Sequence, residues 1–191
     1  MSLSEDPRWR RFNDRDTPCP CCGRTFNGVF DIGYDHPDPW PHGNRAASGE
    51  EELIVGEDSL GTDLCVFGKY RFVRCILPIP IIGTEARFAF GPWASLAPDR
   101  FDEYLLNFAD PTNPPLDACF AWLMNLLPGF DFAKPLPCDL VVGAEGQRPT
   151  LWVQEGSHEL AQCQRDGITF DRLLDIYAAA GQDIRPHLMD A

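Results

Sequence analysis

The sequence predicts an α+β domain in which an antiparallel sheet, built from hairpins and meanders, packs against several helices. Short apolar runs separated by turn residues occupy residues 63–95, and amphipathic helical patterns follow from residue 98 onward. Strands and helices do not alternate regularly, which argues against a doubly wound parallel sheet. The chain has 191 residues, 44% of them hydrophobic, which suffices for one domain with a sizeable core.

The first strands are predicted around Gly68. Residues 64–67 and 70–77 form the arms of a hairpin, because glycine in the first central position suits a type II′ turn. A third strand is expected at residues 86–95. Pro92 lies within it and cannot donate to a sheet ladder, so this strand is predicted to be bulged or at an edge.

A surface helix is predicted to begin at Pro98, and a buried core helix is predicted at residues 117–127. The second prediction rests on a run that is apolar almost throughout and ends at Pro128. A strand pair at residues 140–142 and 150–153 is expected next.

Two helices are predicted to close the domain. Ser157 is expected to cap a short helix that ends near Gly167. Thr169 then begins a longer amphipathic helix, which stops at Gly181 because glycine readily ends a helix.

Composition divides the chain into four segments. Residues 1–16 mix opposite charges and are predicted to be a flexible N-terminus. Residues 17–62 are rich in Cys, Pro and Gly and are expected to be mainly loop. Residues 63–185 hold the α+β core, and residues 186–191 form a C-terminal tail.

The charge balance restricts the partners. Sixteen basic residues against twenty-nine acidic ones give a net charge of −13, which repels polyphosphates and excludes nucleic acid as an expected ligand. An acidic surface instead favours a protein partner with a basic surface. No apolar leader or bilayer-length apolar run occurs, so we expect no membrane association and a cytoplasmic location.

The Cys19-Pro20-Cys21-Cys22-Gly23 cluster is the one motif with a chemical signature. Cys19 and Cys22 have the spacing of a zinc knuckle, which is half of a tetrahedral zinc site, and Cys21 lies between them. The candidates for the remaining ligands are Cys21, His36, His42 and Cys65. The alternative is a thiol-bearing turn held by packing alone, since no second CxxC or HxxxH motif follows.

Catalytic residues cannot be assigned from the sequence. A nucleophilic or redox role for Cys21 or Cys22 would require a lowered thiol pKa, and Arg24 is the one nearby cation. The candidate ligand-binding residues are Trp93, Trp122, Arg148 and His158. The competing interpretation is core packing for the two tryptophans, and a structural role at the start of a helix for His158.

Several short motifs follow one another in a set order along the chain. They are Cys-x-Cys-Cys-Gly at 19–23, Leu-Cys-Val at 64–66, Tyr-Arg-Phe-Val-Arg at 70–74, Ile-Pro-Ile at 79–81, Phe-Gly-Pro-Trp-Ala-Ser-Leu at 90–96, Phe-Ala-Trp-Leu at 120–123, Arg-Pro at 148–149 and His-Glu-Leu-Ala at 158–161. Because it carries these motifs together and in this order, the chain resembles the bacterial family named domain of unknown function 2199. The resemblance runs from about Cys19 to Ala179. Cys75, Phe90 and Cys163 depart from the family pattern. The resemblance implies a bacterial source and a shared fold, and no activity.

These observations predict a non-catalytic binding or regulatory module with an acidic surface. The alternative is a metal-binding protein, or a metal-dependent enzyme, that uses Cys19, Cys21 and Cys22 with zinc. A third hypothesis is an enzyme with a pocket around Trp93 and Trp122.

Overall fold

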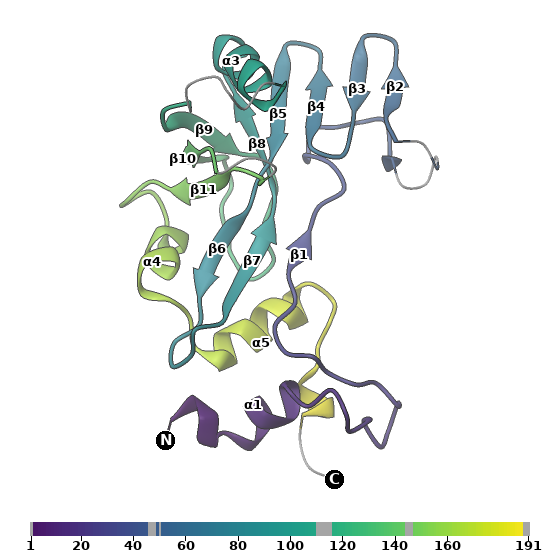
Figure 1. Cartoon of the computed structure of the whole chain (residues 1–191), viewed down its shortest axis with the longest axis vertical. Coiled ribbons are helices and arrows are strands. Elements are labelled where there is room, and N and C mark those ends of the chain that lie inside the picture. The colour runs from purple at the N-terminus through teal and green to yellow at the C-terminus, as the bar shows by residue number, and fades with distance from the viewer. Residues whose placement is uncertain (1, 46–48, 50, 110–115, 144–146, 189–191) are drawn as a thin grey trace.

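The computed structural model describes residues 2–45, 49, 51–109, 116–143 and 147–188. It confirms the predicted α+β class: a large antiparallel sheet, a small second sheet and several helices (Figure 1). None of the described helices is long and apolar enough to cross a bilayer.

Eight antiparallel strands make the main sheet, in the order β11-β10-β9-β8-β5-β4-β3-β2. Their bounds are β2 Leu53–Val55, β3 Asp58–Leu60, β4 Leu64–Phe67, β5 Tyr70–Arg74, β8 Trp93–Leu96, β9 Cys119–Leu123, β10 Leu136–Val141 and β11 Thr150–Val153. The β4–β5 hairpin is the predicted one, and Gly68 takes a positive φ of 52° in its turn.

The small sheet has the order β1-β7-β6, with bounds β1 Ile32–Gly33, β6 Leu77–Pro80 and β7 Arg87–Gly91. The predicted strand 70–77 and the predicted strand 86–95 are each divided between the two sheets. The second division falls at Pro92, where the chain leaves the small sheet after β7 and enters the main sheet as β8. The bulge or edge predicted at Pro92 is therefore a change of sheet.

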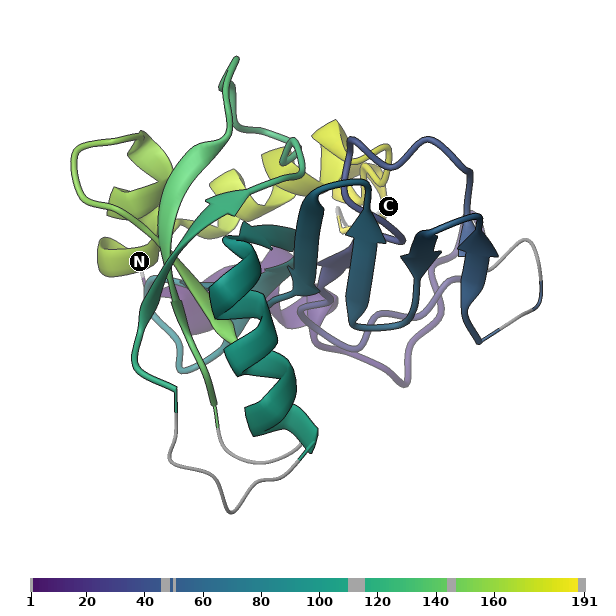
Figure 2. The same cartoon turned by 90° about the horizontal axis from the view of Figure 1, so that it is seen from above.

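The described helices are η1 Leu3–Glu5, α1 Pro7–Phe12, α3 Pro98–Ala109, α4 Glu159–Asp166, α5 Phe170–Ala179 and η2 Arg185–His187. Thr169 caps α5 as predicted, its hydroxyl accepting from the Arg172 amide at 3.2 Å. The cap of α4 is His158, whose Nδ1 accepts from the Leu160 amide at 3.1 Å, and not Ser157. Figure 2 shows α3 running alongside the main sheet when the molecule is viewed from above.

The predicted core helix at 117–127 is wrong, because residues 119–123 form strand β9. Cys119, Ala121 and Leu123 are buried, while Phe120 and Trp122 are exposed. This alternation has the period of a strand with one buried face. The run is apolar on both sides because its outward side chains are aromatic, and that hid the period of two.

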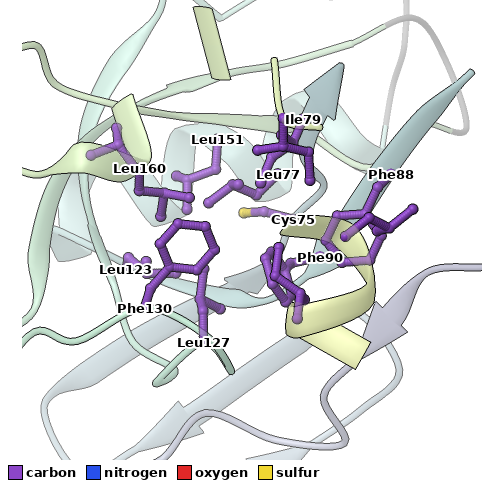
Figure 3. Packing of buried hydrophobic residues seen from close by; sticks show 14 of the residues in the cluster. Cys75, Leu77, Ile79, Phe88, Phe90, Leu123, Leu127, Phe130, Leu151 and Leu160 are labelled. Atoms are coloured by element: carbon purple, nitrogen blue, oxygen red, sulfur yellow. The ribbon is translucent and has the colours of Figure 1, made fainter. Parts of the chain in front are cut away.

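Two hydrophobic clusters lie on opposite faces of the main sheet. The larger one lies between the main sheet, the small sheet, α3, α4 and α5, and Figure 3 shows part of it around Cys75, Leu77, Phe88, Phe90 and Phe130. The smaller one contains Trp40, Leu60, Cys65, Phe72 and Trp93. Residues next to each other on β5 and β8, such as Phe72 and Val73, belong to different clusters, as a strand requires.

The N-terminal segment packs more closely than we predicted. Phe12 at the end of α1 is fully buried against Phe26, Phe170 and Tyr177, so residues 7–12 do not behave as a frayed terminus. The C-terminal residues Ile184 and Leu188 are also buried. In Figure 1 the purple N-terminal segment and the yellow C-terminal segment lie side by side at the lower end of the molecule.

Candidate metal centre

The cysteine-rich turn has the backbone of a two-thiolate knuckle. The Cys19 amide donates to the Arg24 carbonyl at 2.8 Å, and the Gly23 amide donates to the Cys19 carbonyl at 2.8 Å. Gly23 takes a φ of 73°, a conformation that favours glycine. The turn is therefore closed by its own backbone and presents its sulfur atoms to one side.

His187 completes the cluster from the other end of the chain. It ends η2, and its amide donates to the Ile184 carbonyl at 3.0 Å. Ile184 and Leu188 are buried on either side of it in sequence, and the Phe26 ring lies 6.4 Å from the imidazole between ring centroids. The imidazole is thus positioned by packing that involves both termini.

The four side chains converge closely. The Cys19 and Cys21 sulfurs are 3.1 Å apart, and His187 Nδ1 lies 3.5 Å from Cys19 Sγ, 3.2 Å from Cys21 Sγ and 3.6 Å from Cys22 Sγ. All four ligand atoms lie within 4.8 Å of one another. With zinc bonds of about 2.3 Å to sulfur and about 2.0 Å to nitrogen, a tetrahedral site needs separations of about 3.5–3.8 Å. Small adjustments would bring the group to that geometry.

The cluster also favours negative charge on one sulfur. The pKa of Cys19 is lowered to about 6, first because the Cys21 thiol donates to its sulfur and then because the backbone amides of Cys21 and Cys22 do so. The pKa of Cys21 is raised to about 11 in turn, because it holds the shared proton beside that thiolate. A cation at this place would meet a site already arranged for thiolates.

The structure brings together the three predicted cysteines and leaves out the other candidate ligands. Cys65 is fully buried in the smaller hydrophobic cluster. His42 Nε2 is 2.8 Å from Asp58 Oδ2, and His36 Nδ1 is 2.9 Å from the Pro37 carbonyl oxygen. His187 was missed because 168 residues separate it from Cys19 and no ligand motif surrounds it. Only the fold closes that distance.

Trp93 and Trp122 occupy different environments. Trp93 is fully buried, and its indole N–H donates to the Tyr34 carbonyl at 3.1 Å. Trp122 is 43% exposed on β9. Arg148 Nε donates to Asp63 Oδ1 at 2.6 Å, which occupies its guanidinium with a structural ion pair.

His158 lies apart from these three residues. Its Nδ1 caps α4 and its Nε2 is 2.9 Å from the Asp131 carbonyl oxygen. It borders an open polar depression together with Gly129, Asp131, Glu159 and Arg172. None of the other three candidates lines that depression, so the four predicted ligand-binding residues do not share this site.

Comparison with known proteins adds the family. The family described as "Uncharacterized protein conserved in bacteria (DUF2199)" matches residues 18–168, and the chain belongs to it. The match includes Cys19, Cys21 and Cys22 and ends before His187. No curated protein and no solved structure matches the chain.

Proposed function

We propose that this DUF2199 protein binds one zinc ion through Cys19, Cys21, Cys22 and His187. The observation that carries the proposal is the convergence of three sulfurs and one imidazole nitrogen within 4.8 Å. Sulfur and imidazole ligands in a four-membered set suit zinc, whereas magnesium and calcium prefer oxygen ligands.

The ligand set favours a structural role for the ion. Catalytic zinc keeps one coordination position for water or substrate, whereas four protein ligands fill a tetrahedral shell. Cys19 is buried and the other two cysteines are exposed, so the ion would sit at the edge of the domain. With all four side chains bound to the ion, none of them would be left to act as a general base.

The ion would join the two ends of the chain. Three ligands belong to the turn after α1, and the fourth belongs to the segment after α5. Coordination would therefore fix residues 184–188 against the N-terminal segment. Without the ion, the hydrophobic contacts of these five residues come from two buried side chains, Ile184 and Leu188. Metal-binding free energy acts as folding free energy for such a segment.

A role as a non-catalytic binding or regulatory module with a basic protein partner is compatible with this site and stays a prediction. The cytoplasmic location stays a prediction too. The zinc proposal does not depend on either.

The test is the metal content and affinity of full-length protein prepared without added zinc. We expect about one equivalent of zinc per chain by elemental analysis. His187→Asn should weaken zinc binding at least about 100-fold in a competition titration with a chromogenic chelator, since even the groups that support metal ligands are worth about 10- to 100-fold.

His42→Asn is the matched control, because His42 pairs with Asp58 away from the cluster. This variant should retain the zinc affinity of the unmodified chain. Equal affinity in all three proteins, or less than about a tenth of an equivalent in the unmodified chain, would overturn the proposal.

A further inference from the structure

One part of the main sheet leaves large aromatic side chains open to solvent. On β9 Phe120 is 47% and Trp122 43% exposed, and on β10 and β11 Val141 and Trp152 are each 39% exposed. We call this surface the outer face, made of Phe120, Trp122, Asp139, Val141 and Trp152. Exposed apolar groups gathered in this way are typical of interaction surfaces.

Strand register places these side chains next to one another. Phe120 pairs with Asp139, and Asp139 pairs with Trp152, so the carboxylate lies between the two rings in one row across the sheet. Trp122 is two residues from Phe120 on β9, and their ring centroids are 5.0 Å apart in an edge-to-face arrangement. Three aromatic side chains thus share one sheet face with a carboxylate, and two of them, Phe120 and Trp152, flank it directly.

The rest of the same sheet face is covered by the chain itself. Trp93 is buried there beneath residues 34–43, where the Trp40 indole donates to the Gly43 carbonyl at 2.8 Å. Asn125 fastens this cover, because its side-chain amide donates to Asp38 Oδ1 at 2.8 Å and its oxygen accepts from the Trp93 amide at 2.8 Å. No described residue of this cover extends over Phe120 or Trp152 to bury them.

The charge of the outer face indicates what it recognises. Strands β8 to β11 contain a single charged residue, Asp139, and no lysine or arginine. Asp139 receives one hydrogen bond, from Gln154 Nε2 at 2.9 Å, and is otherwise free of partners among the described side chains. Aromatic faces attract cations through their quadrupole, and a carboxylate between them adds a direct ionic partner.

We propose that the outer face is a docking surface for an arginine- or lysine-rich segment of a partner protein. Cationic side chains lie over the rings of Trp122 and Trp152, and one of them pairs with Asp139. The net charge of −13 steers such a segment toward the protein. This inference goes beyond the zinc site and does not depend on it, because the outer face and the cysteine cluster share no residue.

The experiment uses a synthetic peptide of alternating arginine and serine, about twelve residues long so that it spans several strands, with a glutamate–serine peptide as the counterpart. The full-length protein is labelled with nitrogen-15, and the indole N–H signals are followed during titration. We expect the arginine peptide to shift the signals of Trp122 and Trp152. Trp40 and Trp93 are internal references, because their indoles are hydrogen-bonded to backbone carbonyls inside the protein.

Two variants test whether the peptide binds to this face or is attracted only by the acidic surface as a whole. Trp122→Ala and Asp139→Asn should each weaken binding of the arginine peptide about fivefold, as expected for loss of one cation–π or ionic contact of about 1 kcal/mol. Asp102→Asn on α3 is the matched control, because it removes the same charge from an exposed helix position. It should change affinity less than about twofold.

Three results would overturn the proposal. One is the absence of indole shifts for Trp122 and Trp152 at millimolar peptide, and another is equal weakening by Asp139→Asn and Asp102→Asn. The third is a dimer in sedimentation analysis that Trp122→Ala dissociates, since a second copy would then be the occupant. A cooperative thermal unfolding transition in each variant, within a few degrees of that of the unmodified chain, shows that the domain itself is intact.

Discussion

Seven of the eight cysteines of this protein fall into two regions with opposite chemistry, and the eighth, Cys163, is half-buried on α4. Cys19, Cys21 and Cys22 lie together at the edge of the domain beside an imidazole, whereas Cys65, Cys75, Cys119 and Cys138 are buried in the hydrophobic clusters on the two faces of the sheet. In the first region neighbouring donors lower the pKa of Cys19 to about 6. In the second, burial raises the pKa of Cys65 and of Cys138 to about 12.

The difference teaches that the surroundings, and not the residue type, decide whether a cysteine is a ligand or a small hydrophobic side chain. The cluster has backbone amides and a histidine around its sulfurs, and it lies where two chain segments must be held. The interior cysteines have methyl groups and rings around them, and they fill space. Each prediction below perturbs one region and asks whether the other responds.

The largest effect is expected from Cys19→Ser. Zinc should fall below about a tenth of an equivalent, because the variant lacks the buried member of the four ligands. Hydrogen exchange at the His187 and Leu188 amides, which donate to Ile184 and Arg185, should accelerate about 100-fold or more. Cys138→Ala is the control and should retain one equivalent. If Cys138→Ala also released zinc, the two regions would not be separate.

Leu123→Ala should destabilise the protein by about 2–5 kcal/mol, because it removes a fully packed side chain at the end of β9. Urea unfolding measures this cost. The neighbouring change Trp122→Ala should cost about 1 kcal/mol or less, since that ring points to solvent. Zinc content should stay at one equivalent in both variants. Equal costs at positions 122 and 123 would contradict the strand and its orientation.

Alkaline pH should destabilise the domain through its interior thiols. A thiol in the unfolded chain ionises above about pH 8.5, whereas Cys138 keeps its proton until about pH 12. The unfolded state therefore binds fewer protons in this window, and the stabilisation that is complete below pH 8.5 is lost as pH rises. Each such thiol contributes a loss of about 1.4 kcal/mol per pH unit.

Urea unfolding at pH 8 and at pH 10 tests this prediction. The unmodified chain should lose about 1–2 kcal/mol more over this interval than Cys138→Ala does, since the variant lacks one interior thiol. Identical losses in the two proteins would show that Cys138 ionises freely in the native state.

The smallest effect is expected from Arg148→Gln. The ion pair with Asp63 is 2.6 Å long but partly exposed, with side-chain exposures of 38% and 32%. Exposed pairs are worth about 1 kcal/mol or less, so thermal unfolding should move little and zinc content should not change. A loss of several kcal/mol would instead place this pair among the contacts that hold the domain together.

Local sequence signals predicted those parts of the fold that are decided locally. Thr169 and Gly181 bound α5 because a cap and a helix stop act within a few residues, and the hairpin at Gly68 follows from turn geometry alone. Strand β9 was mistaken for a helix because the aromatic residues Phe120 and Trp122, which face solvent, made the run look buried on all sides. An exposed aromatic face cannot be told from a core by hydrophobicity.

The metal centre could be predicted only in part, because three of its ligands are close together in the sequence and the fourth is not. The knuckle at Cys19 and Cys22 is a local motif and could be recognised, whereas His187 becomes a neighbour only after α5 docks and Ile184 and Leu188 are buried. Trp93 was an ambiguous candidate because an indole serves equally well in a pocket or in a core. In the structure it is fully buried in the smaller hydrophobic cluster.

X-ray absorption at the zinc edge of full-length protein tests the central claim most directly. We expect three sulfur neighbours at about 2.3 Å and one imidazole nitrogen at about 2.0 Å, with the nitrogen signal lost in His187→Asn. A first shell of four sulfurs, a shell dominated by oxygen, or an imidazole signal that persists in His187→Asn would contradict the assignment of His187 as the fourth ligand.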